Sequence, residues 1–164
     1  MNATPAIPPG MTAITPHLTC RNAAAAIDFY QRAFGAVELA RLPSPDGKLA
    51  HALLTIGGAS LMLVDEYAEQ GMLSPQALNG SPVTIHLYVA DADATFAQAI
   101  AAGATVAMPL ADMFWGDRFG VVVDPFGHEW SIATHLRDLT PDEIAAAALE
   151  AMKERKGCPD QQGA

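Results

Sequence analysis

The sequence predicts an α+β protein in which two βαβββ repeats form a curved-sheet cavity, followed by a C-terminal helix. The main observation is a pattern that occurs twice: residues 14–22, around His17, match residues 83–91, around His86. The same spacing relates two pairs of glycines, Gly47 with Gly116 and Gly58 with Gly127. An internal repeat defines the architecture before any single motif does. We therefore expect two half-domains that face a shared cavity.

The first repeat is expected to span residues 12–65, after an irregular, proline-rich tail at 1–11. Its first strand, 12–20, alternates apolar and polar side chains, as a half-buried strand does. Asn22 is a good N-cap for a helix over 23–34, which Gly35 then ends. Three further strands follow near 37–42, 49–56 and 59–65.

The second repeat is expected at 82–135, after a linker at 66–81, so that residues 12–135 form one domain. Its strand near 83–89 has the apolar face Val83, Ile85, Leu87 and Val89. Asp91 caps a helix that carries Phe96 and Ile100 and ends at Gly103. Strands follow near 104–108, 118–124 and 128–134, with Asp124-Pro125-Phe126-Gly127 as a turn.

A C-terminal helix is expected within residues 136–156, and residues 157–164 are expected to be a disordered tail. The sequence Thr140-Pro141-Asp142-Glu143 provides an N-cap, a proline at the first helical position and a capping-box glutamate. Ile144, Ala148 and Met152 form its apolar stripe.

Composition excludes several classes of partner. The 164 residues are 51% hydrophobic and carry a net charge of −9, which argues against nucleic acid and against an anionic membrane surface. No apolar run is long enough to span a membrane, and no basic region followed by an apolar run suggests a signal peptide. Two cysteines, Cys20 and Cys158, offer no disulfide framework. We expect a cytoplasmic protein.

Strand alternation predicts which side chains line the cavity. The apolar face of each first strand belongs under the helix, which leaves the opposite face for the concave side. That face carries Thr15, His17 and Thr19 in the first repeat and Thr84, His86 and Tyr88 in the second. The last strands add Ser60 and Met62, and Glu129 and Ser131. A concave surface with a few convergent polar groups is the default ligand site.

The segment Phe114-Trp115-Gly116-Asp117-Arg118 is a second candidate for ligand contact. Trp115 is able to stack on a planar ligand, and the Arg118 guanidinium to hold a carboxylate or phosphonate. The alternative is structural, with the tryptophan packed under the loop and an ion pair between Asp117 and Arg118.

The chain resembles the vicinal-oxygen-chelate superfamily over residues 12–135. This group includes glyoxalase I, bleomycin-binding resistance proteins, fosfomycin-modifying enzymes and extradiol dioxygenases. The local marks are Ala26-Ile27-Asp28-Phe29-Tyr30, Phe34-Gly35-Ala36 and Asp124 to Trp130. Asp46-Gly47-Lys48, His51-Ala52, Leu61-Met62-Leu63 and the 114–118 segment look more specifically like the PhnB-like branch.

The resemblance places the metal-ligand positions of the superfamily at four residues: Thr15, Met62, Thr84 and Ser131. None of these is a usual ligand for a divalent metal, which prefers imidazole and carboxylate. We therefore expect no metal and no other cofactor. His17, His86 and Glu129 are the alternative set, for Zn, Ni, Mn or Fe, if the fold brings them together.

Three functions follow as hypotheses. The first is binding of a small polar or aromatic molecule in the cavity between the repeats, similar to the use that bleomycin-resistance proteins make of the fold. The second is a metal-dependent lyase or transferase of the glyoxalase or fosfomycin type. The third is a metal-free enzyme with histidine as general base. The residues expected to act chemically are His17, His86 and Glu129; those expected to contact the ligand are Thr15, Met62, Thr84, Tyr88, Trp115, Asp117, Arg118 and Ser131. The superfamily also suggests a homodimer.

Overall fold

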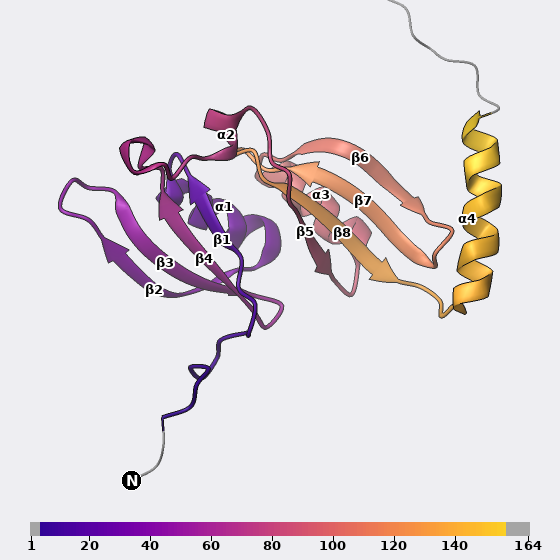
Figure 1. Cartoon of the computed structure of the whole chain (residues 1–164), viewed down its shortest axis with the longest axis horizontal. Coiled ribbons are helices and arrows are strands. Elements are labelled where there is room, and N and C mark those ends of the chain that lie inside the picture. Colours follow the sequence, from indigo (N-terminus) through magenta and orange to yellow (C-terminus); the bar gives the residue numbers. More distant parts are fainter. Residues whose placement is uncertain (1–3, 157–164) are drawn as a thin grey trace, which may run out of the picture.

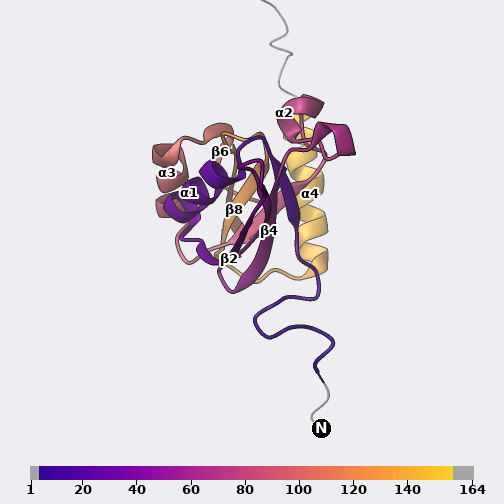
Figure 2. The same ribbon diagram turned by 90° about the vertical axis from the view of Figure 1, so that its left-hand side faces the viewer.

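The computed structural model describes residues 4–156 and contains the two βαβββ modules that the repeat predicts. The modules lie beside each other, each with a four-stranded sheet and one long helix (Figure 1). The helix of each module, α1 or α3, lies on the same side of the sheets. The other face of each sheet is left open by these two helices (Figure 2). The predicted α+β fold class is confirmed.

The first module has strand order β1-β4-β3-β2. Strands β1 and β4 run parallel, whereas β4, β3 and β2 are antiparallel neighbours. Its elements are β1 (His17–Cys20), α1 (Ala23–Phe34), β2 (Val37–Pro43), β3 (Leu49–Ile56) and β4 (Ala59–Asp65).

The second module repeats this topology with strand order β5-β8-β7-β6. The registers correspond: His17 lies opposite Met62 in the first module, and His86 lies opposite Ser131 in the second. Its elements are β5 (Thr84–Tyr88), α3 (Ala92–Ala102), β6 (Thr105–Asp112), β7 (Asp117–Val123) and β8 (Glu129–His135).

Each long helix begins where its cap residue predicts. The Asn22 side chain accepts a hydrogen bond from the Ala25 amide, and the Asp91 side chain accepts one from the Ala94 amide. These caps satisfy amides that have no partner within the helix. Gly35, with φ of 64°, ends α1 in the left-handed conformation that glycine adopts without strain.

The two modules share one hydrophobic core. The Tyr30 and Phe34 rings of α1 pack on Trp130 of β8, with ring centroids 5.2 and 4.6 Å apart. At the same contact, the Tyr30 hydroxyl donates to the buried Asp124 carboxylate at 2.7 Å. Asp124 also accepts hydrogen bonds from the Trp130 indole and from the amides of Phe126 and His128. Its turn is thus structural and joins the modules.

Two sequence predictions about strands and one about a helix need correction. The first strand was expected from residue 12 and begins only at His17; before it, the Thr12 and Thr15 hydroxyls donate to carbonyls within their own turn. Ile14 and Val83, expected on apolar faces, are 86% and 63% exposed. Ile100 of α3 is also exposed, and Ala99 is buried in its place beside Phe96.

The linker is more ordered than predicted. It contains a 3-10 turn, η1 (Ala68–Gln70), and a short helix, α2 (Pro75–Leu78). Ser74 caps α2, proline occupies its first turn, and Asn79 ends it in the left-handed conformation. Such caps are the residue types that helix ends select, but four residues are too few to show helical periodicity.

The C-terminal helix α4 (Pro141–Lys156) begins with the predicted capping box. The Thr140 amide donates to the Glu143 carboxylate at 2.8 Å, and the Glu143 amide donates to the Thr140 hydroxyl at 3.3 Å. The helix stands at the end of the second sheet (Figure 1). Its expected apolar stripe is not buried, since Met152 is 60% exposed. The tail predicted for 157–164 lies outside the described residues. No helix in the described chain is long and apolar enough to cross a membrane.

Candidate functional site

An open cavity of about 570 Å³ lies between the two modules; we call it the inter-module cavity. Strand β1 with the residue before it contributes residues 16–19, and β5 with the residues before it contributes 80–86. His128 and the linker side chains Leu73, Pro75 and Leu78 complete the lining. The cavity is therefore lined by His17 and His86, which occupy equivalent positions of the two repeats, together with Thr19 and Thr84.

His17 has a second histidine beside it. The His51 ring of β3 stands edge-on to the His17 ring, with centroids 5.6 Å apart. Partial desolvation, and then the neighbouring His51, lowers the pKa of His17. The lowered pKa favours the neutral His17 imidazole, in which one ring nitrogen donates a hydrogen bond and the other accepts one. Sequence reasoning gave His51 little weight, although the alternation of β3 places it on the open face.

His86 is held by its own module. Its Nδ1 lies 2.7 Å from the buried Ser131 hydroxyl, directly across the β5–β8 pairing. The Tyr88 ring stands edge-on to it at 4.5 Å, and the Phe119 ring is stacked at 6.0 Å. Ser131, predicted to contact a ligand, instead orients the imidazole that lines the cavity.

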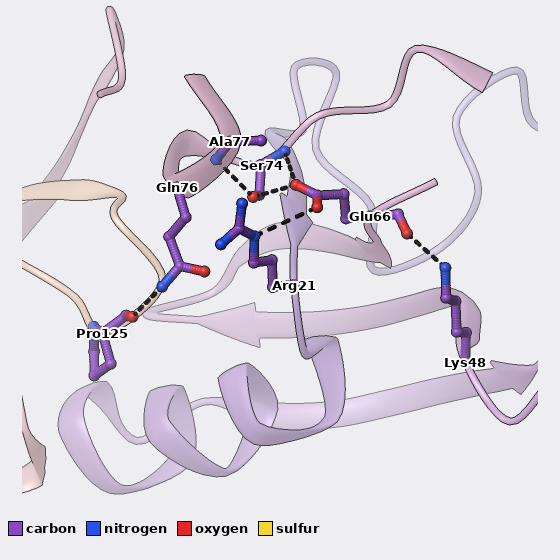
Figure 3. Close-up of polar contacts among 7 residues, drawn as sticks. All are labelled: Arg21, Lys48, Glu66, Ser74, Gln76, Ala77 and Pro125. Atoms are coloured by element: carbon purple, nitrogen blue, oxygen red, sulfur yellow. Dashed lines mark hydrogen bonds and ion pairs between the residues drawn. The ribbon is translucent and has the colours of Figure 1, made fainter. Parts of the chain in front are cut away.

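The linker forms a further part of the cavity lining, and polar contacts fix its position (Figure 3). The Glu66 carboxylate accepts hydrogen bonds from the Ser74 amide and hydroxyl and from Arg21. Hydrogen bonds from Ser74, followed by the Arg21 charge, hold the pKa of Glu66 below its usual value. At the far end, the Gln76 amide donates to the Pro125 carbonyl at 3.0 Å. The linker is thereby attached to both modules.

Glu129 does not join the two histidines in a metal site. Its carboxylate accepts a hydrogen bond from the Thr84 hydroxyl at 3.0 Å, and it is not among the residues that line the cavity. Within residues 4–156, no three His, Cys, Asp or Glu side chains lie close enough together to hold a metal ion. The alternative set of His17, His86 and Glu129 therefore does not fit a metal in the described chain.

Asp117 organises the open face of the second sheet. This buried carboxylate accepts hydrogen bonds from Tyr88 at 2.9 Å, Trp115 at 3.1 Å and His135 at 2.7 Å. Burial alone would raise the pKa of Asp117, but the bonds from His135, Tyr88 and Trp115 outweigh it and lower the pKa. Asp117 thus fixes Tyr88 beside His86 and Trp115 beside Phe119.

The structural alternative for the 114–118 segment, an ion pair between Asp117 and Arg118, is not formed. The Arg118 guanidinium instead binds Asp93 of α3 at 2.7 Å and Asp112 at 3.2 Å. Adjacent residues of a strand point to opposite faces, so Arg118 lies on the helix side of the sheet whereas Asp117 lies on the open side. Its guanidinium is thereby directed away from the cavity.

The remaining predicted contact residues lie outside the cavity lining. Thr15 donates to the Thr12 carbonyl, and Met62 is half-buried beside His17 in the first sheet. Ser60 is buried beneath the N-terminal segment, where its hydroxyl donates to the Gly10 carbonyl. Ser60 and His86 both border a smaller cavity of about 140 Å³ at the other end of the contact between the modules.

His128 is a further residue that lines the inter-module cavity. Its Nε2 lies 3.7 Å from the Cys20 thiol, and its backbone amide donates to Asp124. Burial lowers the pKa of His128, against the opposing effect of Asp124. Burial also raises the pKa of Cys20 far above its usual value, so the thiol is unreactive as a nucleophile.

Comparisons with known proteins agree with this fold. A protein of Mycobacterium bovis, named as uncharacterized, is 54% identical over 82% of this chain and 91% of its own. An Arabidopsis thaliana protein, also named as uncharacterized, is 36% identical over 66% of this chain and 69% of its own. A crystal structure of a Pseudomonas aeruginosa protein has a TM-score of 0.64 at 28% identity, covering 77% of this chain and 99% of that one.

A structure named as a putative 3-demethylubiquinone-9 3-methyltransferase, PhnB protein, from Bacillus cereus has a TM-score of 0.60. Its identity is 21%, over 75% of this chain and 99% of that one, so the likeness concerns the fold. Residues 11–132 match the family described as Glyoxalase/Bleomycin resistance protein/Dioxygenase superfamily. With this match and the paired βαβββ modules, the chain belongs to the Glyoxalase/Bleomycin resistance protein/Dioxygenase superfamily.

Proposed function

We propose that this chain binds a small organic molecule in the inter-module cavity. The observation that carries the proposal is the convergence of His17 and His86, from equivalent positions of two modules, on one cavity of about 570 Å³. Ligand cavities commonly measure about 300–1,000 Å³ and combine an apolar lining with a few placed polar groups. This cavity has that composition.

The proposed roles divide between contact and support. His17, Thr19, Thr84 and His86 supply hydrogen bonds to the ligand, since each lines the cavity. Ser131 supports His86 from behind. Tyr88 and Trp115, fixed by Asp117, extend the binding surface along the open face of the second sheet. Bleomycin-resistance-like binding and membership of the PhnB-like branch remain parts of this proposal.

A second candidate is proton transfer by a histidine without a metal. It is favoured by the lowered pKa of His17, because a neutral imidazole is the form that accepts a proton. The two candidates differ in whether the ligand is chemically changed after incubation with the protein. Mass spectrometry of the recovered ligand separates them.

The test is a thermal-shift screen of small metabolites, followed by calorimetric titration of each hit. His17→Ala and His86→Ala should each weaken a hit at least about tenfold, the equivalent of about 1.4 kcal/mol. Arg118→Ala is the matched control and should leave the affinity unchanged, because its guanidinium points to the helix side. Hits that neither histidine variant affects would contradict the proposed site.

A further inference from the structure

The inter-module cavity has no acidic or basic side chain other than histidine in its described lining. The titratable groups on its surface are three histidines, His17, His86 and His128. The protein lowers the pKa of His17, by desolvation and His51, and that of His128, by burial, so both rings are neutral at pH 7.

Charged side chains near the cavity lie outside its lining. The Glu129 carboxylate accepts a hydrogen bond from the lining Thr84 hydroxyl but does not itself line the cavity, and Arg21 pairs with Glu66 on the linker. Arg118 is bound to two aspartates on the helix side of the second sheet. An ionised ligand that enters the cavity therefore loses part of its hydration and gains no counter-charge from a Lys, Arg, Asp or Glu side chain of the described lining.

The two walls of the cavity have different chemistry. The wall formed by β1, β5 and the residues just before them presents the imidazoles and hydroxyls of His17, Thr19, Thr84 and His86. The same segments also contribute apolar residues: Pro16, Leu18, Pro82, Val83 and Ile85. The linker wall presents three apolar side chains, Leu73, Pro75 and Leu78. The Glu66 and Gln76 contacts hold this apolar wall in place (Figure 3). A ligand that fits both walls has one apolar side and one side that hydrogen-bonds.

We propose that the inter-module cavity selects an uncharged amphipathic molecule, with its apolar part against α2 and its hydroxyl, carbonyl or amide group against β1 and β5. This inference rests on the proposed function and adds the class of ligand. It sets this chain apart from sites that recognise carboxylates, phosphonates or amines through an ion pair.

The test uses three probes that share one ring system and differ in charge: 2-naphthalenemethanol, 2-naphthoate and 2-naphthylmethylammonium. Calorimetric titration at pH 7 should show the alcohol binding about tenfold more tightly than either ion, the equivalent of about 1.4 kcal/mol. An ion that binds as tightly as the alcohol overturns the inference. Absence of binding by all three also overturns it.

The second experiment introduces a charge into the apolar side of the cavity that the linker forms. Leu78 is 56% exposed on α2 and lines the cavity, so Leu78→Lys should fold normally. This variant should bind 2-naphthoate at least about fivefold more tightly than the wild type and bind the ammonium probe more weakly. Leu149→Lys on α4 is the matched control, because Leu149 is 61% exposed and lies outside the cavity. Equal responses in the two variants would overturn the inference.

Failure of this inference is distinguishable from failure of the proposed function. If charged molecules are the hits that lose affinity in His17→Ala and His86→Ala, the cavity is a ligand site and the inference about charge is wrong. If no hit depends on either histidine, the proposed function itself is wrong.

Discussion

Two glycines in turns of the same kind allow the contribution of the contact between the linker and the second module to be measured separately. Residues 44–47 and 124–127 form the same kind of turn, each with proline second and glycine fourth. In both, the glycine amide donates to the first carbonyl at 3.0 Å. The φ angles of Gly47 and Gly127 are 85° and 90°, so both occupy the left-handed region.

The two positions differ in what a methyl group would meet. A Cβ atom on Gly47 has no heavy atom within 4 Å, whereas a Cβ on Gly127 would lie 2.9 Å from the Pro75 Cβ. The free energy of unfolding of Gly47→Ala should therefore fall only by the cost of the left-handed conformation, about 1–2 kcal/mol. For Gly127→Ala it should fall by that amount and by a further cost for displacing the proline ring, about 1–3 kcal/mol.

The assay is urea unfolding of both variants against the wild type. Gly127→Ala should be less stable than Gly47→Ala by about 1–3 kcal/mol. It should also weaken binding of 2-naphthalenemethanol, because Pro75 lines the inter-module cavity, whereas Gly47→Ala should not. Equal losses of stability, within about 0.5 kcal/mol, would refute the claim that α2 is packed closely against this turn.

Three further predictions concern the core, the open face and association. Tyr30→Phe should lower the free energy of unfolding by about 1.5–3 kcal/mol, because it removes a buried hydrogen bond to the Asp124 carboxylate. A loss of less than about 0.5 kcal/mol in urea unfolding would contradict this role of Tyr30. Hydrogen bonds that the His135 ring donates to Asp117 and then to Asp138 raise the pKa of His135. Its stabilisation is therefore complete below about pH 6.5 and is lost as the pH rises through the raised pKa. The wild type should therefore lose more stability than His135→Gln between about pH 6 and pH 8, and parallel pH profiles would exclude this effect. Sedimentation velocity should give twice the mass of one chain, because apolar side chains are exposed along the edge strand β2; a single-chain mass at micromolar concentration would contradict association.

Much of the fold was predictable because the sequence contains an internal repeat. The repeat around His17 and His86 predicted equivalent strands, and the structure places both side chains on one cavity. Asn22 and Asp91 predicted where the long helices begin. These signals are local, and local hydrogen bonding determines helix ends regardless of the tertiary contacts around them.

Other parts of the site depend on strand boundaries that sequence patterns leave uncertain. The strand β7 begins at Asp117, one residue earlier than expected, so the prediction did not place Asp117 and Arg118 on opposite faces of one strand. The Arg118 guanidinium, which was expected to contact a ligand, binds Asp93 instead. The linker wall was also missed, although Ser74-Pro75 and Asn79 are recognisable as helix ends in retrospect.

The shared core has a consequence for how the two modules came to be joined in one chain. A single module on its own would expose either the Tyr30 and Phe34 rings or the Trp130 ring with the Asp124 carboxylate. It would need a second copy to cover that surface, and such pairing depends on concentration. Covalent linkage through residues 66–81 makes the pairing intramolecular, with an effective concentration of about the millimolar range for a short connection. The fused chain therefore keeps its inter-module cavity at any dilution, and its two halves are free to diverge.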